Sequence, residues 1–382
     1  MSELVHPEAE FQEIAHSGGR ITIGVRTQDD GRRSYQTTWR SSRPVPAALI
    51  GVYALPPGVP VASMMLGGIG AKINPAPVPG CFQVFIGSDS EGKFGHNCQG
   101  CDRYWRGEPW TTICPYCGNR AAGHEFLSKA QLIYIRQYIQ ALCVALGTGE
   151  DGEFTIDMDA VADAAGESTE RPAFFYADEA QQNKFICDAC GCYHDVLGRF
   201  VYCSRCGTRN DLQELETNLV GAIRARIEFG EPYESRITET VSTFDSFARR
   251  YAEQLVNFVP MTPRRKALFA RSFHDLRSTA ASFKEVFDID ILDSVSREDA
   301  QFAELMFHRR HVYEHKGGEA DEKYIADSGD RGVRPRQTLH ESRESAHRLA
   351  SVVVRMTRNL HRGFHDILPP EPEPIERKAR LK

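Results

Sequence analysis

Residues 310–318 read RHVYEHKGG and contain side chains from which a catalytic site can be built. Arg310 stands five places before His315, and two glycines end the stretch. The same residues include His311-x2-Glu314-His315, in which two histidines on one helical face could bind zinc beside a glutamate base. The first pattern predicts a metal-free nuclease and the second a metallopeptidase, so the surrounding elements must decide between them.

The motif is expected on a helix of a helical bundle. Ser296 can cap the N-terminus of that helix, and Gly317-Gly318 can end it. Amphipathic patterns over 244–259, 262–287 and about 340–363 predict neighbouring helices, with a loop rich in Gly, Asp and Arg up to about 338. The expected core positions are Leu268, Phe269, Phe273, Leu276, Phe283, Phe302, Leu305, Met306, Leu349, Val352, Val353, Met356 and Leu360.

In this context the motif resembles that of the HEPN family. The family motif is R-x4-6-H, commonly with Asn, Asp or His directly after the arginine, as His311 is here. The resemblance covers residues 240–365 and extends to the Lys-Gly-Gly and Asp-Glu-Lys-Tyr-Ile that follow His315. HEPN proteins are all-helical and usually dimeric, and many are metal-independent endoribonucleases of toxin–antitoxin, abortive-infection and CRISPR systems.

The resemblance implies a role for each residue of the motif. Arg310 would hold the scissile phosphate and stabilise the charge that develops on it. His315 would act as general acid or base toward the ribose 2′-OH and the leaving oxygen, and His311 would orient the pair or contact the phosphate. In the family, two protomers bring their motifs together into one composite site.

Helix geometry sets a condition on this assignment. Five residues along an ideal helix separate two side chains by about 140°. Arg310 and His315 are therefore expected to converge only if the helix loosens near its end or a second protomer contributes. A histidine in the last turn also faces the negative end of the helix dipole, which favours the imidazolium.

Other interpretations of the motif stay open. HEPN-like bundles include domains that bind RNA or protein without cleavage, and Arg310 with Glu314 could form a simple i,i+4 ion pair. In the metallopeptidase interpretation His308 would be a third ligand for zinc. A carboxylate ligand would then have to come from the last helix, where Glu341 and Glu344 are candidates.

Eight of the 11 cysteines form two quartets with the same spacing. In each quartet two C-x2-C pairs are separated by twelve residues, and four thiolates at such turns predict a closed tetrahedral Zn²⁺ site. Gly118 and Gly207, directly after the last cysteine of each quartet, permit the positive φ that such a turn often needs. The expected ligands are Cys98, Cys101, Cys114 and Cys117 in the first site and Cys187, Cys190, Cys203 and Cys206 in the second.

The two stretches resemble zinc ribbons, in which two such turns are joined by a β-hairpin. The resemblance implies two structural zinc ions per chain, although an Fe–S cluster has the same ligands. Cys192 is a spare thiol beside the second quartet and is expected to be a bystander. Tyr104, Trp105, Arg106 and Trp110 could either stack on bases or pack the first hairpin.

The N-terminal half reads as a small β domain. Residues 20–25, 34–39 and 81–86 are β-prone, turn formers separate them, and Pro and Gly are dense between 44 and 80. Gly67–Lys72 fits neither common phosphate-binding motif. Apolar spacing over 126–146, ended by Gly147, predicts a helix.

Composition points to an intracellular protein with local partner sites. The N-terminus lacks the charge and apolar pattern of a secretory signal, and the most apolar stretch, 59–73, is too short and Gly-rich to span a membrane. A cytoplasmic setting makes the cysteines metal ligands rather than disulfides. The net charge is −6 and no segment is strongly basic, so RNA contacts must be local.

The sequence therefore predicts an α+β multidomain protein. Its expected activity is metal-independent RNA cleavage in a toxin or defence context, by a homodimer formed through the HEPN-like domain, with a substrate or protein partner recognised by the ribbons or the β domain. The expected parts are a flexible lead-in (1–18), a β-rich domain (19–95), zinc ribbon 1 (96–120), a helical insert (121–184), zinc ribbon 2 (185–210), an all-α HEPN-like bundle (240–365) and a disordered tail (366–382).

Overall fold

The structure is a computed structural model that describes residues 14, 18–42, 48–65, 77–89, 91–109, 111–147, 150–171, 182–270 and 273–381. The chain divides into two compact units: Met1–Gly207 with Glu371–Lys382, and Thr208–Pro370. Most of the predicted lead-in, the glycine-rich 67–72 stretch and Trp110 lie outside the described residues. The α+β class is confirmed, with small sheets in the first unit and helices in the second.

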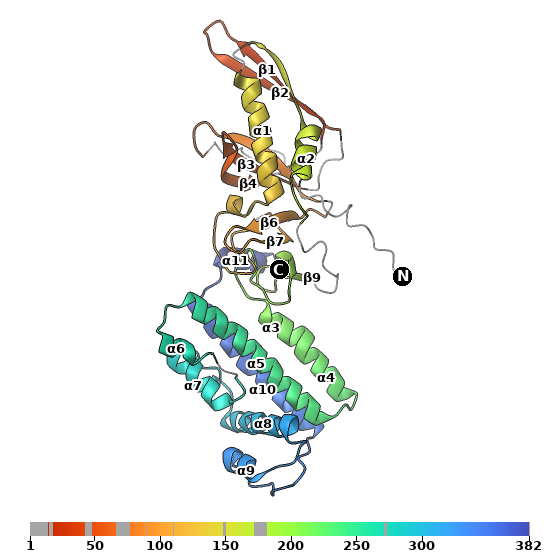
Figure 1. Cartoon of the computed structure of the whole chain (residues 1–382), viewed down its shortest axis with the longest axis vertical. Helices are drawn as coiled ribbons and strands as arrows, with labels where there is room; N and C mark the ends of the chain where they lie inside the picture. The colour runs from red at the N-terminus through yellow and green to blue at the C-terminus, as the bar shows by residue number, and fades with distance from the viewer. Residues whose placement is uncertain are drawn as a thin grey trace. The chain divides into compact units, whose positions relative to one another are not determined.

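Two three-stranded antiparallel sheets form the N-terminal part of the first unit (Figure 1). The three predicted strands are confirmed as β1 (Arg20–Thr27), β2 (Arg33–Arg40) and β5 (Phe82–Gly87). The sheets have the orders β2-β1-β8 and β4-β3-β5, where β3 is Leu49–Leu55, β4 is Val59–Met65 and β8 is Gly152–Asp157. In β3 five central residues are buried, which accounts for its continuous apolar sequence.

The predicted helical insert, 121–184, is not a separate part. Its strand β8 pairs with β1 in antiparallel register, from Arg20 opposite Asp157 to Val25 opposite Gly152. Helices α1 (Lys129–Gly147) and α2 (Met158–Glu167) belong to the same fold. Their apolar faces share one core with the sheets, so β domain and insert fold together. The core includes Ile23, Val52, Val84, Tyr134, Ile135, Ile139, Ile156 and Met158.

The two cysteine-rich stretches share a third sheet, of order β6-β7-β10-β9. Strands β6 (Phe94–Cys98) and β7 (Arg103–Gly107) come from the first stretch, and β9 (Gln182–Ile186) and β10 (Tyr193–Leu197) from the second. Strands β7 and β10 pair directly, so the two stretches form one body instead of two separate ribbons. In each stretch the hairpin carries the first C-x2-C turn of the quartet at its tip. The predicted zinc ribbon has a hairpin between its two C-x2-C turns, which is not the arrangement here.

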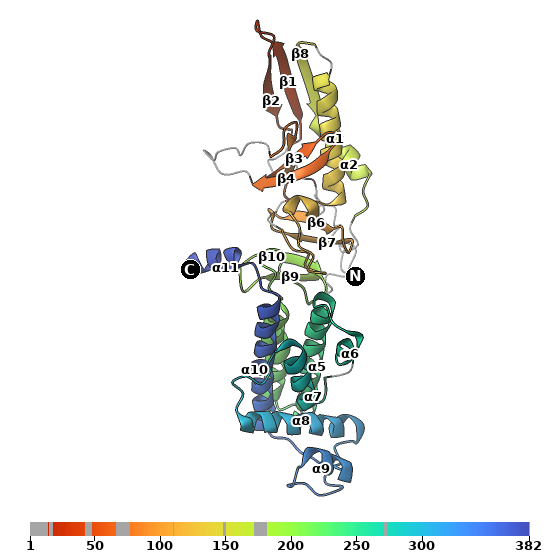
Figure 2. The same cartoon turned by 90° about the vertical axis from the view of Figure 1, so that its left-hand side faces the viewer.

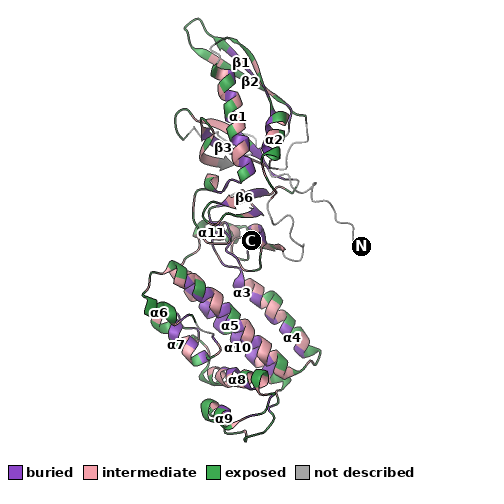
Figure 3. Ribbon diagram, viewed as in Figure 1, coloured by how far each residue is buried: buried purple, intermediate pink, exposed green. Residues whose placement is uncertain are grey.

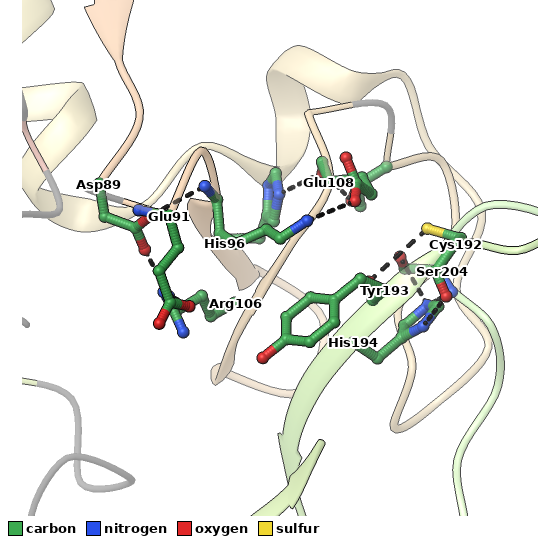
Figure 4. A network of polar contacts seen from close by, with 11 residues as sticks. Asp89, Glu91, His96, Arg106, Glu108, Cys192, Tyr193, His194 and Ser204 are labelled. Atoms are coloured by element: carbon green, nitrogen blue, oxygen red, sulfur yellow. Dashed lines mark hydrogen bonds and ion pairs between the residues drawn. The ribbon is translucent and has the colours of Figure 1, made fainter. Parts of the chain in front are cut away.

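A buried ionic network fastens this sheet to the rest of the unit (Figure 4). Arg106 on β7 pairs with Asp89, after β5, and with Glu91, and its Nη1 lies 3.4 Å from Asp195 Oδ2 on β10. The guanidinium on β7 thus joins the segment after β5 to β10, and leaving Arg106, Asp89 or Asp195 buried without a partner would be costly.

The second unit is helical from Asp211 onward, about thirty residues earlier than predicted. The run expected over 262–287 is broken into α6 and α7, and α5 begins before residue 244. The elements are α3 (Asp211–Glu214), the π-helical η5 (Leu215–Leu219), α4 (Val220–Glu228), α5 (Tyr233–Phe258), α6 (Pro263–Ala267), α7 (Leu276–Phe287), α8 (Arg297–His315), α9 (Glu322–Ser328) and α10 (Arg343–Ile367).

Helices α5 and α10 lie side by side and form the centre of this unit (Figures 2 and 3). Both carry a continuous buried stripe, and α8 packs across them. Glycine at position 363 allows close packing, because a Cβ there would lie 2.7 Å from Ile289 Cγ2. The expected core residues of α10, namely Leu349, Val352, Val353, Met356 and Leu360, are all fully buried.

The predicted disordered tail is wrong for most of its length. Helix α10 continues to Ile367, and Pro372–Arg380 form α11. This helix packs on the second cysteine cluster through Ile375. The Glu371 N–H donates to Cys206 O at 2.7 Å, and Lys378 Nζ donates to Asp188 O at 2.7 Å. Contacts between residues so far apart in sequence leave no local pattern, which is why the sequence predicted a disordered tail.

Acid should destabilise the second unit through His361. Burial, followed by the neighbouring His365, lowers the pKa of His361 to about 3, and His361 Nδ1 lies 2.6 Å from the Tyr251 hydroxyl. The folded state therefore disfavours the proton that the unfolded chain binds below about pH 6.5. This contribution is complete above pH 6.5, and it falls below that pH by at most about 1.4 kcal/mol per pH unit for one proton.

Denaturant unfolding of wild type and His361→Gln between pH 7.5 and 4 checks this expectation. The variant should show the shallower loss of unfolding free energy, and His340→Gln, an exposed control, should follow wild type. Parallel curves for wild type and His361→Gln would contradict it.

Candidate functional site

The cysteine quartets converge as predicted and make two possible metal sites. In each quartet the four sulfur atoms lie within 4.8 Å of one another. Sulfur–sulfur distances of 3.7 Å between Cys101 and Cys114 and 3.5 Å between Cys190 and Cys203 occur in the two quartets. Zinc with Zn–S bonds of about 2.3 Å places sulfurs about 3.8 Å apart in a tetrahedron. Both clusters thus have the size of a four-thiolate site, with no position left for substrate.

All four C-x2-C turns have the same backbone. In each, the residue after the second cysteine has positive φ, and its N–H donates to the carbonyl of the first cysteine. Gly118 and Gly207 were expected there, and Asp102 and Gly191 complete the pattern. The turn directs both thiols of a pair to the same side, so local sequence alone creates each half of a site.

The spare thiol Cys192 is buried but is not part of a second ligand set. It lies with His194 and Cys203 in a group of suitable size. However, His194 Nε2 accepts a hydrogen bond from the Ser204 N–H at 2.8 Å, and Nδ1 lies 3.0 Å from Cys192 O (Figure 4). Both nitrogens of this histidine are used within the protein. Burial lowers its pKa to about 4, so it stays neutral.

Two of the possible stacking residues pack the first hairpin instead. Trp105 is fully buried between His96, Tyr116 and Phe126. Arg106 belongs to the ionic network described above. Tyr104 is half-buried and lines a cleft beside α1.

The residues of the R-x4-H motif line one cavity of the second unit. Arg310, His311 and His315 all border a depression of about 540 Å³ beside α8. Helix α8 is fixed there by its neighbours. The preceding Arg309 contacts the Tyr324 hydroxyl at 3.2 Å and forms ion pairs of 2.9 Å with Asp330 and 3.0 Å with Glu341. The cavity wall therefore rests on a buried ionic cluster.

Arg310 and His315 meet at one carboxylate oxygen. Arg310 Nη2 lies 2.6 Å and His315 Nε2 lies 3.7 Å from Glu314 Oε2. The expected loosening of the helix is not present, because α8 is regular through His315. Convergence comes from the length of the arginine side chain, which reaches one turn onward. The ion pair considered as an alternative is thus present, and it holds the guanidinium beside the imidazole.

Cationic, acidic and histidine side chains line the cavity together: Arg310, Lys316 and Lys323, then Asp275, Glu304 and Asp327, then His274, His308, His311 and His315. Burial and then the charges of His315, Lys316 and Arg310 lower the pKa of His311. Desolvation, together with Arg310, lowers the pKa of His274, although Asp245 opposes the shift. Among the described residues, Arg310 Nε and His274 Nδ1 are buried without a hydrogen-bond partner. An unsatisfied buried donor such as Arg310 Nε costs about 1–3 kcal/mol.

Sequence reasoning missed several residues of this cavity. His274 enters from the segment before α7, and Lys316, Lys323 and Tyr324 come from the α8–α9 region. Positive φ at Gly317 and Gly318 ends α8 and turns the chain, so that α9 packs back on α8. The Gly-Gly pair signalled this turn, whereas no spacing rule connects His274 to a helix more than twenty residues later.

The metallopeptidase interpretation lacks a third protein ligand. His308 lines the same cavity, but among the described residues it does not gather with His311 and His315 into a group that fits one ion. Glu341 is committed elsewhere, since it accepts hydrogen bonds from Arg309 at 3.0 Å and from the Tyr313 hydroxyl at 2.7 Å. Glu344 lies in the first turn of α10. Among the described residues, the arrangement therefore gives the peptidase no complete ligand set.

The comparisons with known proteins give no relative. No protein-family model, no curated protein and no solved structure matches this chain. Among the described helices, none is both long and apolar enough to cross a membrane.

Metal content should follow the two quartets. We expect elemental analysis of the purified protein to find two metal ions per chain, and Cys206→Ser to lose one of them. Cys192→Ser, the matched control beside the same cluster, should retain both, because its thiol is outside the tetrahedral set. A decrease of metal in Cys192→Ser equal to that in Cys206→Ser would contradict the ligand assignment.

Proposed function

We propose that residues 240–365, within the unit Thr208–Pro370, form an HEPN-like domain that cleaves RNA without a metal ion, and that the protein works in a toxin or defence context. The observation that carries the proposal is that Arg310 and His315 line one cavity, and that Arg310 Nη2 and His315 Nε2 lie 2.6 Å and 3.7 Å from the same oxygen of Glu314. A guanidinium and an imidazole around a single anionic oxygen are the groups that phosphodiester cleavage by a neighbouring hydroxyl requires.

The chemistry assigns a task to each group. A phosphate oxygen would replace the Glu314 carboxylate at Arg310, and the guanidinium would stabilise the charge that builds up on phosphorus oxygens during attack. The ribose 2′-oxygen, losing its proton to a base, would bond to phosphorus while the bond to the 5′-oxygen breaks. His315 would supply one of the two proton transfers.

A second proton-transfer group is needed, and two sources are at hand. His311 borders the same cavity, and its ring centre lies 4.7 Å from that of His315. Its lowered pKa keeps it neutral and able to accept a proton near neutral pH. In the family that the motif resembles, a second protomer supplies its own histidine. We therefore propose a homodimer formed through this domain.

We further propose that both cysteine clusters hold Zn²⁺. Four thiolates in a closed tetrahedral arrangement are the donor set that structural zinc prefers, and such a site contributes on the order of 10 kcal/mol to a small module. The bound ion would neutralise the thiolates and fix the two hairpins of the shared sheet. Its role is structural, so the chemistry stays in the second unit.

RNA cleavage in the absence of divalent metal should depend on the motif. We expect the full chain to cleave single-stranded RNA during a brief incubation with a chelator of divalent metal ions. The substitutions Arg310→Ala and His315→Ala should each slow cleavage by about 100-fold or more. The readout is the initial rate on an end-labelled RNA, with elemental analysis showing that both structural ions are retained.

Matched substitutions separate chemistry from general charge. Arg297→Ala removes an arginine at the exposed start of the same helix, and His340→Ala removes an exposed histidine of the same unit. Both variants should cleave RNA as fast as wild type does. Full cleavage by Arg310→Ala and His315→Ala would remove the nuclease assignment. RNA binding without cleavage by wild type would favour the binding module, and protein hydrolysis that needs metal would favour the peptidase.

A further inference from the structure

A cleft of the first unit has a composition unlike the rest of that unit. It measures about 910 Å³ and lies between the start of α1 and the hairpin β6–β7, which adjoin in both views (Figures 1 and 2). We call it the α1 cleft. It is lined by Asn97, Asp102, Arg103, Tyr104, Tyr116, Lys129, Ala130, Leu132, Ile133, Arg136, Ser168, Thr169, Glu170, Arg171 and Leu197.

Basic side chains outnumber acidic ones in the α1 cleft. Four arginines and lysines face two carboxylates there, whereas the whole unit, Met1–Gly207 with Glu371–Lys382, contains 21 Lys and Arg against 26 Asp and Glu. Lys129 Nζ lies 3.1 Å from Asp102 Oδ1, so part of its charge is shared. Arg103 and Arg136 are exposed, and neither has a carboxylate partner among the described residues. The excess charge is therefore available to an anionic ligand.

One wall of the cleft alternates cations with an apolar surface. Lys129 and Arg136 are seven residues apart on α1, which places them on one face and about 10 Å apart along the axis. Leu132 and Ile133 lie between them on the same face. This wall can bind two separated phosphate groups while presenting an apolar surface to what lies between them.

The opposite wall offers flat groups for stacking. Tyr116 is fixed in place, because its hydroxyl donates to Tyr104 O at 2.8 Å and accepts from the Leu197 N–H at 3.1 Å. The Arg103 guanidinium lies over its ring, 5.4 Å from the centre. Tyr104 borders the same cleft. A guanidinium stacked on a tyrosine, with a second tyrosine beside it, is a surface on which unpaired bases can stack.

We infer that the α1 cleft binds single-stranded nucleic acid. Cations along one wall and stacking groups on the other match the two needs of such a ligand, contact with phosphates and contact with base faces. A duplex hides its base faces and gains only the charge term. The choice of RNA over DNA rests on the proposed function: the cleft would hold a stretch of the substrate apart from the position at which it is cleaved.

Fluorescence anisotropy with labelled single-stranded RNA tests the inference. The full chain carrying Arg310→Ala serves as the reference, so that cleavage does not interfere. Adding Arg103→Ala and Arg136→Ala should raise the Kd by about 10-fold or more, and the slope of log Kd against log salt should fall by about 0.7 for each phosphate group that the cleft no longer binds. Adding Arg26→Ala and Arg32→Ala, two exposed arginines of the β1–β2 hairpin, changes the charge equally and should alter the Kd less than twofold.

Two further arms separate stacking from charge. Tyr104→Ala should weaken binding of the single strand, whereas Tyr104→Phe, which keeps the ring, should not. A duplex of the same sequence should bind more weakly than the single strand. Circular dichroism and metal content establish that each variant is folded.

The outcomes also separate this inference from the proposed nuclease. Four results would each overturn the cleft assignment. They are equal weakening of binding in the two double-arginine variants, unchanged binding in the cleft variant, absence of RNA binding by the reference, and preference for the duplex. If wild type cleaves RNA and the cleft variant binds as the reference does, the nuclease stands without the cleft. If the cleft binds RNA and wild type leaves RNA whole, the cleft stands without the nuclease.

Discussion

The candidate site depends on where helix α8 ends and on what holds its last turns. Lys316 N–H and Gly318 N–H both donate to the carbonyl of Val312, and two consecutive glycines with positive φ then turn the chain. One residue before Arg310, the half-buried Arg309 ties α8 to Asp330 and Glu341. Leaving any of these charges unpaired would be costly, so the cluster fixes the rotation of the helix. The neighbouring arginine is thereby held at the cavity.

The cysteine clusters and the Arg310 cavity lie in different units. In the first unit the cysteine clusters lie at the ends of a shared four-stranded sheet, and α11 covers one of them. A module of this kind is small, and its metal ligands replace the large apolar core that it lacks. In the second unit the core is extensive, and the polar cluster at α8 is carried on it. A rigid helical support is what the positioning of two reactive groups requires.

Sequence predicted what local patterns determine. The C-x2-C spacing identified eight converging thiols, Ser296 was correctly placed as the cap of α8, and the glycines after each quartet have the expected positive φ. Contacts between distant segments could not be predicted. Three examples are the pairing of β8 with β1, the approach of His274 to Arg310 and the docking of α11 on Cys187. In each case the sequence around the two contacting residues has no pattern that links one to the other. The sequence indicated Glu314 as an ion-pair partner of Arg310, but it did not indicate that His315 also lies near the same carboxylate.

The central claim is that Arg310 and His315 together form a site for a phosphate group. It is tested most directly by titrating inorganic phosphate into the full chain while observing the imidazole NMR signals of His311 and His315. Phosphate should shift both signals in wild type and in the Arg297→Ala control, and Arg310→Ala should abolish the shifts. Signals that do not respond to phosphate, or that respond equally in Arg310→Ala, would contradict it.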